Sequence, residues 1–338
     1  MLKRFVYFFA HGVFLVASYL FFLLSGRNTE RGYQAMVYLF CHTGGRVNNA
    51  LLFLDCMVGT RLRDVRGVGV IGDVLEAERL AEQVLDRGYF VKESALSQEV
   101  CDRLMDFAMS TPAVVRPMDG QEKKGGLRLE RVDLERPAAV RYDYRVSDLL
   151  ANPDVQDLLA DPSLLTLAES YLGTAPKLDV LSMWWHFGFS DSPDSEAAQL
   201  YHFDLDRPRW LKVFIYLTDV GLENGPHSFI EGTHKIDSIP RRFLHRGYVR
   251  LSDAEVHAEY GQDREKVFTA PRGTVIAEDT IGLHKGGVVK GGARLILQLQ
   301  FSSSLFGGIY PKANLPEQQS TALAQAMATN PSVYSGYH

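Results

Sequence analysis

Residues 293–301 have the sequence ARLILQLQF, which is typical of a strand in a β-sheet. Successive side chains of a strand point to opposite faces, so Arg294, Ile296, Gln298 and Gln300 share one face. Leucines occupy the other face. This alternation predicts a strand that packs its leucine face against an apolar core. Its polar face is expected to point inward on the other side of the sheet.

Other runs rich in β-branched and aromatic residues follow Gly173, separated by turns that contain Gly, Pro, Asn and Asp. The chain before Gly173 carries helical patterns instead, with Ser97 as a candidate N-cap. This order predicts a mainly β barrel or sandwich with flanking helices, an α+β arrangement. The expected strands are 177–187, 211–218, 274–277 and 293–302, and the expected helices are 73–86, 97–109 and 149–172. One or two short helices are expected within 31–58, broken at Gly44-Gly45 and Asn48-Asn49.

The composition is that of a globular protein with a substantial core. The chain has 338 residues, of which 46% are hydrophobic and 23% charged. Its formal net charge of −5 provides no positive field for a polyanion, so we expect no nucleic-acid partner. Three cysteines without a CxxC pair suggest neither a disulfide framework nor a thiolate zinc site. A reducing compartment fits best, and we expect a cytoplasmic protein.

Residues 5–24 form an apolar segment without an acidic residue, a lysine or an arginine, flanked by Lys3-Arg4 and Arg27. This length is enough to span a bilayer. A membrane anchor, a secretion signal and an apolar helix that docks on the protein or on a partner are the three interpretations. No small-x-small cleavage site follows Leu24, which disfavours secretion. The anchor and the docked helix both stay open, and an anchor would hold the protein on the cytoplasmic face of a membrane.

The sequence Tyr201-His202-Phe203-Asp204 places an imidazole and a carboxylate on the same side of an extended chain. His284 offers a second imidazole between two expected strands. Two histidines and one carboxylate on one face of an octahedral iron leave the opposite positions free for a co-substrate and dioxygen. We therefore predict that His202, Asp204 and His284 bind a metal ion and form the catalytic centre.

Four other residues compete for roles in this site. Asp206 shares a side with Asp204, but Pro208 indicates that the strand is turning there. His227 and His234 lie in a stretch with the turn sequence Asn-Gly-Pro. We therefore interpret them as turn residues, or as residues that contact the metal ligands without binding the metal. His186 is a candidate pocket residue.

Arg294 follows His284 on the inward face of its strand, and a guanidinium in such a position needs an anion. Its planar fork matches a carboxylate that it can bind through two hydrogen bonds. The distal carboxylate of 2-oxoglutarate is a natural partner. Gln199 and Lys212 are further candidates for co-substrate contacts, although both are equally well explained as polar strand residues.

The ordered series of motifs resembles the phytanoyl-CoA dioxygenase-like family of Fe(II)- and 2-oxoglutarate-dependent oxygenases. The likeness extends over roughly residues 85–305. It rests on Gly88-Tyr89-Phe90-Val91 with Leu96-Ser97, on Tyr201-His202-Phe203-Asp204, on Glu223-Asn224-Gly225-Pro226 through Gly232-Thr233-His234, and on His284 with Arg294.

The resemblance implies a double-stranded β-helix, the jelly-roll or cupin-like core, with flanking helices. It also implies Fe(II), 2-oxoglutarate and O2 as cofactor and co-substrates, with 2-oxoglutarate decarboxylated to succinate and CO2 while a C–H bond is hydroxylated. Related halogenases look as though they replace the carboxylate with a small residue, so Asp204 favours hydroxylation.

The substrate is expected to be a small molecule or a lipid-like molecule. A lipid would suit the apolar segment 5–24 as an anchor. An anionic substrate would suit basic residues gathered at the mouth of the site, for which the candidates are Arg207, Arg209, Arg241, Arg242 and Arg246, although surface solvation explains them as well. Two other functions remain open, a catalytically silent jelly-roll binding protein and a membrane-attached interaction protein.

The expected organisation has four parts. These are an apolar N-terminal helix over 1–28, a helical extension over 29–80, the jelly-roll oxygenase domain over 81–310 and a C-terminal tail over 311–338. The sequence does not indicate an oligomeric state.

Overall fold

The computed structural model describes residues 2–116, 128–188, 198–247 and 250–337. The helices are α1 (Leu2–Ser25), α2 (Glu30–Thr43), α3 (Arg46–Val58), α4 (Val74–Arg87), α5 (Gln98–Ser110), α6 (Val146–Leu150), α7 (Pro153–Leu159), α8 (Pro162–Leu172), α9 (Arg241–Leu244), α10 (Asp253–Tyr260) and α11 (Thr321–Thr329), followed by the 3₁₀-helix η1 (Pro331–Tyr334). The strands are β1 (Tyr89–Lys92), β2 (Ala113–Arg116), β3 (Leu129–Glu130), β4 (Arg141–Asp143), β5 (Lys177–Phe187), β6 (Trp210–Tyr216), β7 (His227–Ile230), β8 (Glu265–Phe268), β9 (Val275–Glu278), β10 (His284–Gly286) and β11 (Ala293–Ser302).

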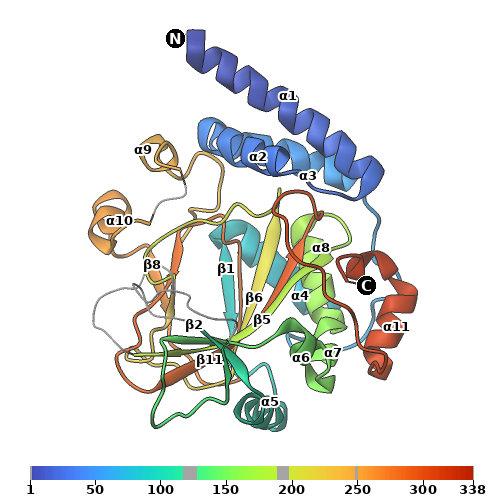
Figure 1. The fold of residues 1–338 in the computed structure, drawn as a ribbon, viewed down its shortest axis with the longest axis vertical. Coiled ribbons are helices and arrows are strands. Elements are labelled where there is room, and N and C mark those ends of the chain that lie inside the picture. The colour runs from blue at the N-terminus through green and yellow to red at the C-terminus, as the bar shows by residue number, and fades with distance from the viewer. Residues whose placement is uncertain (1, 117–127, 189–197, 248–249, 338) are drawn as a thin grey trace.

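The strands form two antiparallel sheets. The larger sheet has the order β1-β9-β6-β11-β5-β4-β2-β3, and the smaller has the order β10-β7-β8. Helices α1, α2 and α3 lie across one end of the sheets, and α5 lies at the opposite end (Figure 1). The mainly β fold with flanking helices is as expected from the sequence.

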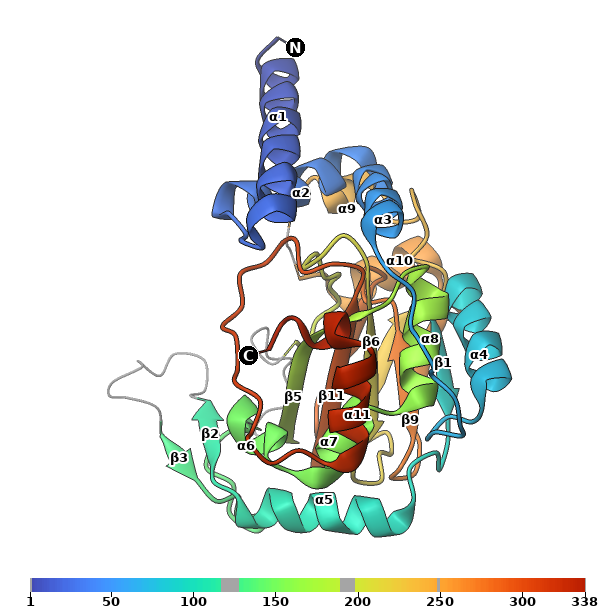
Figure 2. The same cartoon turned by 90° about the vertical axis from the view of Figure 1, so that its right-hand side faces the viewer.

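Strand β11 confirms the expected alternation of faces. Its Leu295, Leu297 and Leu299 belong to the main apolar core, which also contains Leu80 of α4 and Leu167 of α8. The opposite side of β11 faces an interior cavity, which is lined by Arg294, Ile296 and Gln298. In Figure 2, α4, α8 and α11 lie on the core side of this sheet. One strand therefore serves both the core and the interior of the site.

The helices before the sheet begin and end where the local sequence allows. The Ser97 hydroxyl accepts a hydrogen bond from the backbone N–H of Val100 and caps α5, as predicted. Gly88 ends α4 with a positive φ of 96°, a conformation that glycine adopts without strain. The region expected to be helical over 149–172 contains three helices, because Pro153 and Pro162 each start a new one.

Residues 31–58 form two helices with the expected break at Gly44 and Gly45. The expected break at Asn48-Asn49 is wrong, because both asparagines lie inside α3. Asn48 is buried, and its amide donates to the backbone carbonyls of Arg207 and Pro208. The two asparagines thus hold the extension to the sheet instead of breaking the helix.

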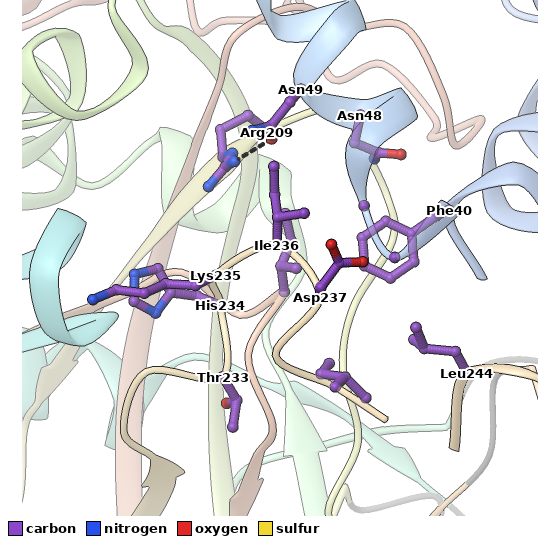
Figure 3. Close-up of a pocket in the computed structure, with 14 residues that line it drawn as sticks. Phe40, Asn48, Asn49, Arg209, Thr233, His234, Lys235, Ile236, Asp237 and Leu244 are labelled. Atoms are coloured by element: carbon purple, nitrogen blue, oxygen red, sulfur yellow. Dashed lines mark hydrogen bonds between the residues drawn. The ribbon is translucent and has the colours of Figure 1, made fainter. Parts of the chain in front are cut away.

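A small cavity marks the contact between the α2–α3 turn and the loop around Lys235 and Asp237 (Figure 3). Its volume is about 20 Å³, which is enough for one water molecule but not for a substrate. Arg209 reaches across to the side chain of Asn49 at 2.7 Å. The backbone N–H of Asp237 donates to the carbonyl of Gly44 at 3.1 Å. Helices α2 and α3 are therefore attached directly to the sheet domain.

An ion pair between Arg207 and Asp179 holds the same end of the fold together. The two side chains are 3% and 2% exposed, and Arg207 Nη2 lies 2.6 Å from Asp179 Oδ1. Arg207 also donates to the backbone carbonyls of Leu305 and Gly308. The replacement Arg207→Ala leaves the Asp179 carboxylate buried without its cation, so we expect the free energy of unfolding to fall by about 3–5 kcal/mol.

The matched control is Arg246→Ala, which removes an exposed pair with Glu255 and should change the stability by less than about 1 kcal/mol. Urea titration of the three proteins makes the comparison. Equal midpoints for both variants would show that the buried pair does not stabilise the fold.

Candidate metal and co-substrate site

The backbone brings His202 and His284 together. The two residues form an antiparallel bridge, in which the N–H of each donates to the carbonyl of the other at 3.0 and 2.9 Å. The N–H of Asp204 donates to the carbonyl of Thr280 at 2.8 Å. The segment after Tyr201 therefore runs beside the segment that leads into β10. Because residues two apart in an extended chain share a side, Asp204 points toward the same space as His202.

The three side chains form a compact group that could hold a metal ion. One ligand atom from each of His202, Asp204 and His284 lies within 4.8 Å of the others. Asp204 Oδ2 lies 3.5 Å from His284 Nε2, and Asp204 Oδ1 lies 3.9 Å from His202 Nε2. The chain thus presents two nitrogens and one carboxylate, and we call this group the triad.

The second nitrogen of each triad histidine is held by the backbone. His202 Nδ1 lies 2.9 Å from the carbonyl oxygen of Leu200, and His284 Nδ1 lies 2.9 Å from that of Gly282. A carbonyl accepts hydrogen bonds only, so each Nδ1 carries the proton and each Nε2 keeps its lone pair. This second contact is the usual way in which a protein orients a metal-binding histidine.

The electrostatics keep His202 and Asp204 in the protonation states that a metal ion requires. Burial, together with the nearby His284, holds the pKa of His202 well below its ordinary value, so its imidazole is neutral. Burial alone would raise the pKa of Asp204, but the charge of Lys212 and the neighbouring His284 outweigh it and hold that pKa well below its ordinary value. The carboxylate is therefore ionised at neutral pH.

Lys212 and Gln199 occupy different surroundings. Lys212 Nζ lies 2.5 Å from Asp204 Oδ2, and the lysine lines the cavity that contains the triad. Gln199 is 5% exposed, and the lining of that cavity includes its neighbour Ala198. Lys212 is thus placed to orient the triad carboxylate. Contacts of either residue with the co-substrate stay a prediction.

The cavity that contains the triad also contains Arg294 and has a volume of about 440 Å³. Arg294 is 2% exposed, and its Nη2 donates to His186 Nδ1 at 2.8 Å. Its Nε and Nη1 have no hydrogen-bond partner within the described part of the chain. Burial lowers the pKa of Arg294 to about 10, so the guanidinium is still charged at neutral pH. A buried cation with free donors is a binding site for an anion.

Two further donors face the same region. His186 Nε2 and Trp184 Nε1 are buried and have no partner among the described residues. Burial and the charge of Arg294 hold the pKa of His186 well below its ordinary value, so its imidazole is neutral. Because its Nδ1 accepts from Arg294, its Nε2 carries the proton and can donate. Arg294, His186 and Trp184 all line the cavity that contains the triad.

The structure also shows where other residues near the triad lie. Trp184 lines the cavity, whereas Trp185 belongs to the apolar core. His227 starts β7 instead of lying in a turn, and its ring stacks against His284 with centroids 5.7 Å apart. Asp206 lines a neighbouring cavity and is not part of the triad.

The expected gathering of arginines at the mouth is wrong for Arg207 and Arg209. Arg207 pairs with Asp179, and Arg209 pairs with Asp279 at 2.9 Å. Both pairs lie inside the protein. The positive charge that the sequence suggested for a substrate is therefore used to hold the fold.

A comparison with protein families matches residues 85–291 to the model described as phytanoyl-CoA dioxygenase. The chain belongs to the phytanoyl-CoA dioxygenase family. The match covers more than half of the chain and includes the triad, although Arg294 lies just beyond it. This family member is a 2-oxoglutarate-dependent non-haem iron enzyme, so the expected class and the expected use of Fe(II), 2-oxoglutarate and O2 are confirmed.

Solved structures similar to this family member include HygX from Streptomyces hygroscopicus with nickel and 2-oxoglutarate bound, with 14% identity, a TM-score of 0.49 and coverage of 72% of this chain and 92% of that one. The epimerase SnoN in complex with Fe3+, alpha ketoglutarate and nogalamycin RO has 18% identity, a TM-score of 0.46 and coverage of 68% and 84%. EctD from S. alaskensis with 2-oxoglutarate and 5-hydroxyectoine has 20% identity, a TM-score of 0.45 and coverage of 72% and 82%. No curated protein sequence matches the chain.

The triad makes a direct prediction about metal binding. His202→Ala or His284→Ala removes one of three ligands, so we expect the affinity for Fe(II) or Co(II), measured anaerobically by calorimetry, to fall by more than about 100-fold. The control is His245→Ala, which removes an exposed histidine outside the triad. An unchanged affinity in both triad variants would contradict this placement of the metal.

Proposed function

We propose that this enzyme hydroxylates a C–H bond of a small-molecule or lipid-like substrate, with Fe(II) bound by His202, Asp204 and His284. The observation that supports this most strongly is that one cavity contains both the triad and the buried Arg294 with its free donors. A metal site alone would fit many functions. A metal site beside a receptor for a carboxylate fits an enzyme that uses 2-oxoglutarate.

Different residues of the chain would bind the metal ion and the co-substrate. The two histidines and Asp204 would hold Fe(II) from one side, and the iron would supply the activation of dioxygen. Arg294, His186 and Trp184 bind the distal carboxylate of 2-oxoglutarate and fix its orientation. Because these donors are buried, they discriminate strongly against a molecule without that carboxylate.

Asp204 supports hydroxylation as the outcome. Its carboxylate occupies the position that the related halogenases look as though they leave to a small residue. Lys212 keeps this carboxylate ionised and turned toward the two histidines. Phe214 and Ile296 give the same cavity apolar walls, which suit the alkyl part of a substrate. Succinate, CO2 and a product with one added oxygen atom are the expected products.

The two alternative functions differ from this one in simple assays. A silent binding protein would bind 2-oxoglutarate without releasing succinate. An interaction protein that acts through α1 would lose its role when the residues before His11 are deleted, a change that keeps the buried Leu15 and Tyr19 in place, whereas the enzyme would still decarboxylate 2-oxoglutarate. The intact triad and Arg294 favour the enzyme. We further propose a cytoplasmic location, where Fe(II) and 2-oxoglutarate are available.

The carboxylate receptor gives a quantitative test. Arg294→Met removes the cation that binds 2-oxoglutarate, so the KM for 2-oxoglutarate in succinate formation should rise by at least about 30-fold, the effect of losing a buried charged partner. The control is Arg136→Met, an exposed arginine outside the cavity. A normal KM in the Arg294 variant would exclude Arg294 as the clamp.

The triad carboxylate gives a second test, read on the product. Asp204→Ala should abolish addition of oxygen to the substrate, which mass spectrometry detects, because the carboxylate ligand is lost. Asp86→Ala is the matched control, since Asp86 is an exposed carboxylate on α4 outside the triad and its variant should retain hydroxylation. Full hydroxylation by the Asp204 variant would disprove its assignment.

A further inference from the structure

Helix α1 carries the largest exposed apolar surface that the structure shows. Its segment Val6–Ser25 is long and apolar enough to cross a membrane, and 11% of that window is buried. No Asp, Glu, Lys or Arg lies between Phe5 and Gly26. Exposed apolar surface of this size on a protein usually meets a membrane or a partner. The exposed large apolar side chains of α1 are Val6, Tyr7, Phe8, Phe9, Val13, Phe14, Val16, Leu20, Phe21, Leu23 and Leu24.

The other side of α1 is firmly docked on the protein. Leu15 and Tyr19 are buried in a cluster with Met36 of α2. The Tyr19 hydroxyl donates to the buried Asp55 of α3 at 2.8 Å. Gly32 allows the close approach of α2, since a Cβ at this position would lie 2.5 Å from Ser18 Cβ. The docked side is therefore built for this contact.

The packing of α1 on α2 limits how deeply α1 can insert into a bilayer. The His11 ring stacks on Tyr38 of α2 with centroids 4.0 Å apart, so α1 stays beside α2 as far back as His11. Only the stretch before His11 projects freely, and it is about 14 Å long at 1.5 Å per residue. The hydrocarbon core of a bilayer is about 30 Å thick. The free part of the docked helix is therefore too short to span a membrane, and its N-terminal end projects from the rest of the protein (Figures 1 and 2).

Helix α3 extends the same apolar surface. Its exposed residues Phe53, Leu54, Met57 and Val58 are between 43% and 69% accessible. Val58 lines one cavity together with Phe22 and Leu23 of α1, so the ends of the two helices flank that cavity. We call the exposed apolar residues of α1 and α3 together the leaflet face.

Three neighbouring cavities lie in a row between the leaflet face and the triad, because each shares lining residues with the next. The first, of about 650 Å³, lies between the ends of α1 and α3. The second, of about 540 Å³, shares Tyr310 and Lys312 with the first. The third is the cavity of the triad, and it shares Val180 and Leu181 with the second.

The lining of the first cavity fits an amphiphile with an anionic head. Phe22, Leu23 and Val58 provide the apolar part. Arg27 and Lys312 are exposed cations on the same cavity, where lipid phosphates would lie. Basic residues beside an apolar surface are typical of helices that lie in the membrane interface.

We propose that the leaflet face seats this enzyme in one leaflet of a membrane, and that an anionic membrane lipid reaches the triad through the row of three cavities. The second half of this inference rests on the proposed function. It names the substrate class as a lipid taken from the membrane, whose head stays near Arg27 and Lys312.

Flotation of the full-length protein with vesicles tests the leaflet face. Leu20→Glu/Leu24→Glu places two charges on exposed positions of α1 without disturbing the docked side. We expect at least about a tenfold loss of binding to vesicles of phosphatidylcholine and phosphatidylglycerol. The matched control is Leu75→Glu/Leu85→Glu on α4, whose leucines are also exposed and whose variant should float like the wild type.

Three results would overturn the proposal that the leaflet face inserts into one leaflet. The first is equal flotation of both double variants. The second is a dimer that forms without lipid and dissociates only in the α1 variant, which would assign the face to a second copy of the chain. The third is an N-terminal tag that becomes protected from protease added outside the vesicles, which would show a spanning helix.

The route through the three cavities is tested separately, by a large side chain that fills the second cavity. Ala313 lines the second cavity and not the cavity of the triad. Ala313→Trp should leave 2-oxoglutarate decarboxylation without substrate unchanged and should reduce oxygen addition to phosphatidylglycerol in vesicles by at least about tenfold. Ala322→Trp on α11, an exposed position, is the control. Unchanged lipid oxidation by the Ala313 variant, or no lipid oxidation by the wild type, would overturn the route. An absence of 2-oxoglutarate decarboxylation by the wild type would instead contradict the proposed function.

Discussion

The site depends on one backbone contact, the bridge between His202 and His284. Two hydrogen bonds fix these residues opposite each other although they are far apart in the chain. The alternation of side chains along a strand then places Asp204 on the same side as His202. Backbone hydrogen bonds inside a protein are hard to distort, so the three ligands are positioned before any metal binds. The hydrogen bonds from the histidine Nδ1 atoms complete this arrangement.

The same sheet leaves buried polar groups unsatisfied in the cavity of the triad, where we propose that the co-substrate binds. An unpaired buried donor costs free energy, so a fold keeps several of them in one place only where a ligand satisfies them. Arg294 and His186 are direct neighbours across β11 and β5, and Trp184 lies two residues away on the same strand. The opposite face of β11 fills the main core. The strand that stabilises the fold thus also carries Arg294, the proposed clamp, so the geometry of the proposed site depends on the stability of the sheet.

Much of this could be predicted from the sequence because the signals are local. The alternating pattern of 293–301, the spacing of His202 and Asp204, and the cap at Ser97 each depend on neighbours in the chain. The partnership of His186 with Arg294 could not be predicted, since it depends on the register between two distant strands. Asn48 and Arg207 misled the sequence interpretation for a related reason. Their polar side chains look solvated in the sequence, but tertiary contacts bury both, with Asn48 donating to backbone carbonyls and Arg207 paired with Asp179. The division into four parts stays a prediction.

The account makes one central claim, that His202, Asp204 and His284 hold iron beside a 2-oxoglutarate fixed by Arg294. Anomalous X-ray diffraction at the iron edge, from crystals prepared without oxygen in the presence of Fe(II) and 2-oxoglutarate, tests it most directly. The account predicts one iron at about 2.0–2.2 Å from His202 Nε2, His284 Nε2 and an Asp204 oxygen, with the distal carboxylate of 2-oxoglutarate on the Arg294 guanidinium. Iron bound elsewhere, or 2-oxoglutarate bound away from Arg294, would contradict it.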